Sequence, residues 1–142
     1  MITPQVRARA AVDAMARNDR DRAADLIAGW ITSQTTGGQA YEFLKAAAMI
    51  AVRAMRSTAG PFASHPRIVW VPMIDDDDNS PKAWAMRFTN AFMNSDESMA
   101  HALFWSEFEA FLAAPDARGT RMAECLAGVL WTAAMAERSV AL

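Results

Sequence analysis

The sequence lacks the features of disulfide-held and membrane-spanning proteins. Cys125 is the single cysteine among 142 residues, so no disulfide can form within the chain. The longest apolar stretches, residues 46–52 and 125–136, are much shorter than the roughly 20 residues that cross a bilayer. The first residues contain no apolar core of the length that a secretory signal needs. We therefore expect a cytoplasmic protein with no membrane partner.

A strong excess of charge of one sign is also missing. The formal net charge is −2, and residues 1–60 hold 8 Lys and Arg against 5 Asp and Glu, while residues 61–142 hold 6 against 11. A dedicated nucleic-acid binder is usually strongly basic over at least one surface. The composition therefore argues against that class without excluding it.

Signals for α-helices are abundant. Alanine, leucine, methionine and arginine dominate most of the chain, whereas glycine and proline gather at a few positions. Thr3-Pro4 and Ser80-Pro81 each match a helix start, with a capping hydroxyl followed by proline at the first helical position. We predict a single all-α domain over residues 1–142, a compact bundle of about six helices. These are expected at about 3–17, 19–33, 39–57, 81–94, 96–113 and 120–138.

A shift of 77 residues aligns several of these signals. It places Thr3-Pro4 on Ser80-Pro81 and Asn18-Asp19 on Ser95-Asp96. Two three-helix units would produce this pattern, but alanine-rich helices also match one another by chance. One compact bundle and two stacked units both remain open.

Residues 58–80 form the one long segment predicted to be irregular. Gly60-Pro61, Pro66 and Pro72 forbid a continuous helix, and the β propensity around Ile68 allows a short strand. This apolar run would either cover its own helices or cross to a second chain, and we favour the second chain with Trp70 as anchor. The predicted partner-binding residues are Ile68, Val69, Trp70, Val71 and Met73.

Aromatic side chains occur at helical spacing in the second half. Trp84, Phe88 and Phe92 are predicted to pack against a second stripe, formed by Phe104, Phe108 and Phe111. Trp131 lies off the apolar stripe of its own helix. Ten methionines and five tryptophans are residue types that adaptable recognition surfaces use. A helical core this small seldom needs five tryptophans and seven phenylalanines, so we expect some of them to bind a partner or a second copy of the chain.

No motif for catalysis or metal binding is present. His65, His101 and Cys125 do not lie at spacings typical of zinc ligands. The acidic run of residues 75–78 lacks the glycine and the final glutamate of a calcium loop, so a solvated loop is expected. We therefore predict no metal and no cofactor.

These observations favour a helical protein–protein interaction module acting as a homodimer, whose partner is another protein or a second copy. One alternative is a nucleic-acid-associated regulator that uses Arg9, Arg17 and Arg20, although Asp13 and neighbouring aspartates compensate this basic face. Another is a small enzyme or ligand binder with a pocket between the aromatic fifth helix and the central segment.

Overall fold

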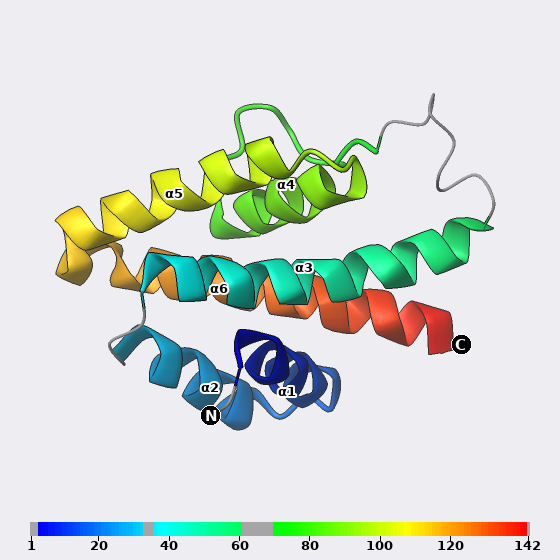
Figure 1. Cartoon of the computed structure of the whole chain (residues 1–142), viewed down its shortest axis with the longest axis horizontal. Helices are drawn as coiled ribbons and strands as arrows, with labels where there is room; N and C mark the ends of the chain where they lie inside the picture. The colour runs from blue at the N-terminus through cyan, green and yellow to red at the C-terminus, as the bar shows by residue number, and fades with distance from the viewer. Residues whose placement is uncertain (1–2, 33–35, 61–69, 142) are drawn as a thin grey trace.

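The structure is a computed structural model that describes residues 3–32, 36–60 and 70–141. Within these ranges it contains six helices and no strand, which confirms the predicted all-α class (Figure 1). The helices are α1 Pro4–Ala16, α2 Arg20–Thr32, α3 Gly37–Ala59, α4 Pro81–Met93, α5 Glu97–Ala113 and α6 Pro115–Ala141.

The helices stack in three layers. The two long helices, α3 and α6, lie side by side in the middle, with α1 and α2 on one side and α4 and α5 on the other (Figure 1). The middle layer supplies much of the core, because Phe43, Leu44 and Val52 of α3 and Val129 and Leu130 of α6 are fully buried. The apolar sides of the outer helices cover this pair from both directions.

The predicted capping signals begin the helices. Thr3 accepts a hydrogen bond from the backbone of Val6, and Ser80 accepts one from Ala83. α3 begins with a capping box, in which Thr36 and Gln39 each bond the backbone of the other. Each cap satisfies backbone donors that a helix start would otherwise leave without partners.

The start of α6 differs from the prediction. A turn was expected around Pro115 to Gly119, with the helix beginning near residue 120, but the helix begins at Pro115 itself. Proline costs nothing at the first helical position, and Gly119 adds only about 1 kcal/mol relative to alanine. A single connecting residue, Ala114, therefore separates α5 from α6.

The two halves of the chain repeat one pattern of elements. α1 and α4 are each 13 residues long, and each begins with a capped proline. Both are followed by the same tight turn, in which Asn18 (φ 60°) and Ser95 (φ 56°) adopt the left-handed conformation. α1 packs on α3 and on α6, and α4 likewise packs on α6 and on α3. The first helix of each half therefore contacts the long helix of the other half.

The described part of the central segment, from residue 70 onward, is bound by side chains of α4 and of Asn94 directly after it. The backbone N–H of Trp70 donates to Asn94 Oδ1 at 2.7 Å, and the Asn90 and Asn94 amides both donate to the Trp70 carbonyl at 2.8 Å. Further along, the Arg87 guanidinium donates to the backbone carbonyls of residues 75, 76 and 78. Residues 70–79 form no strand, because α4 side chains occupy backbone groups that a strand partner would need.

The two aromatic stripes meet through a third helix. Tyr41 of α3 contacts Phe88 of α4 and Phe104 of α5. The indole N–H of Trp84 also donates to the Leu103 carbonyl at 3.2 Å, so α4 and α5 are neighbours, as expected. Phe108, however, is only half-buried and stacks on Phe104 of its own helix.

Candidate functional site

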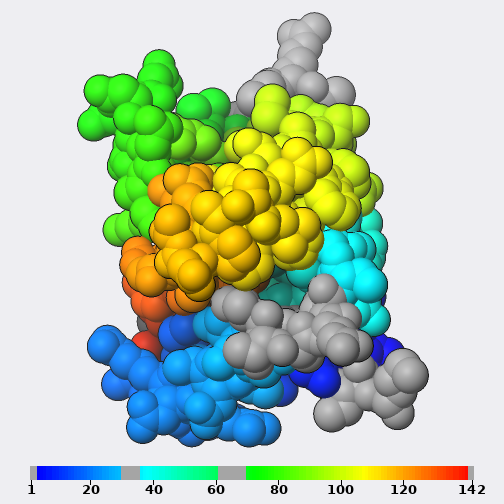
Figure 2. Space-filling view, turned by 90° about the vertical axis from the view of Figure 1, so that its left-hand side faces the viewer, coloured from blue at the N-terminus to red at the C-terminus, as the bar shows by residue number. Residues whose placement is uncertain are grey.

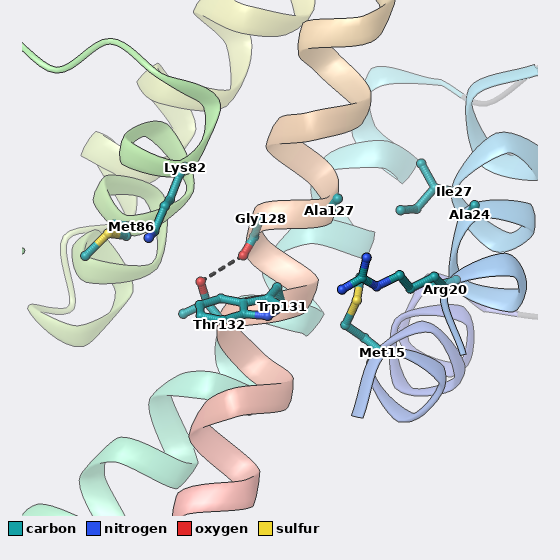
Figure 3. A pocket seen from close by; sticks show the side chains of 11 residues that line it. Met15, Arg20, Ala24, Ile27, Lys82, Met86, Ala127, Gly128, Trp131 and Thr132 are labelled. Carbon is teal, nitrogen blue, oxygen red and sulfur yellow. Dashed lines mark hydrogen bonds between the residues drawn. The ribbon is translucent and has the colours of Figure 1, made fainter. Parts of the chain in front are cut away.

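A groove of about 760 Å³ runs over α6, between α2 and α4 (Figure 3). α6 forms its floor, and the flanking helices form two walls. In the space-filling view, α6 is visible at the left edge between residues 70–85 above and α2 below (Figure 2). The lining residues are mostly apolar: Met15, Arg20, Ala23, Ala24, Ile27, Lys82, Met86, Ala127, Gly128, Trp131 and Thr132.

The floor combines small residues with one large aromatic side chain. A Cβ atom added to Gly128 would lie 2.8 Å from the Ala85 Cβ, so glycine permits the close approach of α4 to α6. One turn further, Trp131 is 49% exposed, whereas Trp84 in the core is 5% exposed. An exposed indole in a concave apolar surface is typical of an interface anchor.

A second groove continues the first along α6. It has a volume of about 460 Å³, shares Trp131 and Thr132 with the first, and extends to Ser139. Trp70 of the central segment also lines it. From Ala127 to Ser139 the two grooves follow α6 for about 18 Å at 1.5 Å per residue.

Two cations stand on the opposite walls of the first groove. Arg20 comes from α2 and Lys82 from α4, and the Lys82 ammonium lies 6.0 Å from the centre of the Trp131 ring. Among the residues that the structure describes, no Asp or Glu lines either of these grooves and neither cation forms an ion pair. The nearby Asp78 carboxylate accepts from the Ser80 backbone, which lowers its pKa, with smaller effects of Arg87 and Lys82.

A related groove on the other edge of the middle layer allows a comparison. A shift of 77 residues places Lys82 on Gln5 and Met86 on Arg9, and a shift of 78 places Trp131 on Arg53. Gln5, Arg9 and Arg53 line a groove of about 360 Å³ over α3. Arg53 thus stands where the α6 groove has its exposed indole. The same pattern of helices therefore forms an apolar floor on one edge and a charged one on the other.

The charges around the α3 groove are paired within the chain. Arg9 bonds both Asp13 and Glu137, which raises its pKa, with the Glu137 bond the larger cause. Glu97 of α5, the counterpart of Arg20, accepts from Lys45 at 2.6 Å and from the Tyr41 hydroxyl at 3.1 Å. The Lys45 bond is the largest cause that lowers the pKa of Glu97. Neither Arg20 nor Lys82 of the α6 groove forms an ion pair with a described residue, although the Lys82 charge acts on the nearby Asp78.

The predicted partner-binding residues have different surroundings. Trp70 is partly buried against its own core, and Val71 and Met73 are 74% and 95% exposed. Ile68 and Val69 lie outside the described residues. The homodimer contact therefore stays a prediction, carried by two exposed side chains beside the anchored Trp70.

The three arginines of the nucleic-acid hypothesis do not line one groove. Arg9 lines the α3 groove, Arg20 lines the α6 groove, and Arg17 is exposed at the end of α1. The Arg9 pair with Asp13 was predicted from their spacing, whereas the pair with Glu137 joins α1 to the far end of the sequence.

The remaining described candidates, Cys125 and His101, lie on α6 and α5. Cys125 is buried, and desolvation raises the pKa of its thiol to about 12, so the thiolate is not formed near neutral pH. His101 Nε2 accepts from the Trp105 indole at 2.8 Å. The part of the chain that the structure describes holds no group of His, Cys, Asp and Glu able to bind a metal. His65 lies outside it.

The alternative of a ligand pocket between the fifth helix and the central segment stays a prediction, because part of that segment lies outside the described residues. The grooves described above follow α6 and α3. The position of Trp131 off its apolar stripe was the one signal that pointed to α6. Comparison of the chain with protein-family models, curated proteins and solved structures gives no match. Among the described helices, none combines the length and the apolar character needed to cross a membrane.

Proposed function

We propose that the chain is a protein-binding module whose α6 groove takes an α-helix presented by a different protein. The observation that carries this proposal is the half-exposed Trp131 on the floor of an apolar groove of about 760 Å³. Large aromatic side chains in apolar depressions supply most of the binding energy at protein interfaces.

The shape of the groove favours an elongated occupant. Two helices form its walls and a third its floor, so a bound helix would complete a bundle by ordinary helix packing. The apolar lining continues along α6 for about 18 Å, which corresponds to roughly three turns of a helix. A compact small molecule would occupy only part of that length. The small side chain of Ala127 on the floor leaves room for close approach.

The charges favour a different protein over a second copy of the chain. A two-fold contact through this groove would bring two copies of Arg20 and Lys82 to the same interface, with no acidic lining residue to neutralise them. Like charges at an interface weaken association. The homodimer predicted from the segment around Trp70 would also use Val71 and Met73, which line none of the grooves described above.

The test is binding of an amphipathic helical peptide of about 18 residues, with leucines on one face and glutamine on its flanks, measured by calorimetry. Trp131→Ala should weaken binding by at least about 30-fold, as loss of an interface anchor does. Leu112→Ala is the matched control, because Leu112 is 58% exposed on α5 and lines none of the grooves described above. Equal affinities of wild type and Trp131→Ala would contradict the proposal.

A further inference from the structure

We infer that the helix bound in the α6 groove carries a carboxylate on each edge of its apolar face, one bound by Arg20 and the other by Lys82. This inference rests on the proposed function and adds the chemistry of the partner: an amphipathic helix with acidic residues flanking its apolar face. The partner is therefore selected by charge as well as by apolar contact.

The two cations of the α6 groove stand on opposite walls. Arg20 extends from the α2 side and Lys82 from the α4 side, and both line the groove that contains Trp131 (Figure 3). Neither has an ion-pair partner among the described residues. A helix lying between the walls would bring its flanking side chains to these two groups, and a carboxylate on each flank can accept from the nearer cation.

In the related groove over α3, the chain supplies acids for two lining cations. Lys45 bonds Glu97, which is the counterpart of Arg20 and does not itself line that groove, and Arg9 bonds Glu137. Arg20 and Lys82 form no such pair with the described residues, so both are open to an acid of the partner.

Apolar surface lies between the two cations. Trp131 on the floor stands between Arg20 and Lys82 (Figure 3), and Met86 and Ile27 also line the groove. A nucleic-acid backbone laid across this surface would cover it without forming further ion pairs. An amphipathic helix matches both parts, with apolar side chains on the floor and an acidic side chain at each wall. We therefore favour an acidic helix over a nucleic acid.

The experiment compares the glutamine-flanked peptide with a second peptide that carries glutamate at the flanking positions. For the wild-type chain, calorimetry at low salt should give about tenfold tighter binding of the glutamate peptide, the size expected from two exposed ion pairs. The double variant Arg20→Gln with Lys82→Gln should lose this preference and keep its affinity for the glutamine peptide. Added salt should reduce the preference in wild type.

Arg53→Gln is the matched control, because it removes a cation from the α3 groove on the other edge. It should retain the full preference for glutamate. Arg20, Lys82 and Arg53 are exposed, so thermal unfolding should show all variants folded.

The outcomes separate the two proposals. Equal binding of both peptides to wild type would overturn the acidic partner and leave the helix-binding function standing. Binding of neither peptide would overturn the helix-binding function itself. If dodecanoate bound in a Trp131-dependent manner and neither peptide did, the groove would be a site for a small anionic amphiphile, and both proposals would be wrong.

Discussion

At the scale of single residues, two glycines of α6 have opposite surroundings. A Cβ on Gly128 would lie 2.8 Å from the Ala85 Cβ, whereas a Cβ on Gly119 would meet its nearest neighbour, a Phe111 carbon, at an ordinary 3.9 Å. Gly128→Ala should therefore lower the free energy of unfolding by about 1 kcal/mol, because overpacking outweighs the gain in helix propensity. Gly119→Ala should raise it by up to about 1 kcal/mol. Urea unfolding of both variants measures this, and stabilisation by both would show that the α4–α6 contact is loose.

Because of the Glu97 carboxylate, the free energy of unfolding should vary with pH in the acidic range. Its bonds to Lys45 and Tyr41 lower its pKa in the folded state from the ordinary value of 4.5. The stabilisation is therefore fully present above about pH 4.5 and is lost as the pH falls through the folded-state pKa. Glu97→Gln should be less stable than wild type at pH 7, and the difference should shrink below pH 4.5. Urea unfolding across pH 3 to 7 measures it.

The control for that series is Glu109→Gln, which removes the same charge from α5. Glu109 forms no ion pair with the described residues, so its loss should have little effect at any pH. If the difference in free energy of unfolding between wild type and Glu97→Gln stayed constant with pH, the carboxylate charge would not be the cause of that difference.

At the scale of elements, the central segment carries the homodimer prediction. The Asn90 and Asn94 side chains hold the Trp70 backbone on α4, while Val71 and Met73 remain exposed. If a second copy covers these two side chains, light scattering at rising concentration should give a dimer for wild type. Val71→Ser with Met73→Ser should be a folded monomer. A wild type that is monomeric at all concentrations would end the homodimer hypothesis.

Helix positions were predictable because their signals are local. Thr3-Pro4 and Ser80-Pro81 predict the starts of α1 and α4 from adjacent residues. The start of α6 was missed because proline and glycine suggest a turn, and only tertiary packing decides whether they continue a helix. The hydrogen bonds from the Asn90 and Asn94 amides to the Trp70 carbonyl were also missed, because these asparagines lie 20 or more residues from the backbone they bind.

At the scale of the whole molecule, the halves depend on each other. α1 packs on α6 as well as on α3, and α4 packs on α3 as well as on α6. A fragment of residues 1–64 would leave the apolar faces of α1 and α3 uncovered. The complementary fragment would leave the apolar faces of α4 and α6 uncovered. We expect each fragment alone to be largely unfolded by circular dichroism, and an equimolar mixture to recover helix. Cooperative unfolding of either fragment alone would instead indicate an independent three-helix unit.

The groove could not be predicted from the sequence, because it is assembled from distant segments. Arg20, Lys82 and Trp131 come from three helices in two halves of the chain. Sequence spacing identified Trp131 as misplaced for the core, but it could not show which helices flank it. The pairing of Arg9 with Glu137 likewise joins residues 128 positions apart. It neutralises one of the three arginines that the nucleic-acid hypothesis requires.

The central claim is that the α6 groove binds a helix, and amide chemical-shift mapping tests it most directly. The labelled full-length chain is titrated with the glutamate-flanked peptide. The account predicts that the largest shifts occur at Ala24, Lys82, Ala127 and the Trp131 indole, with little change at Met49 and Arg53 on the α3 edge. Shifts centred on the α3 edge, or no shifts at saturating peptide, would contradict it.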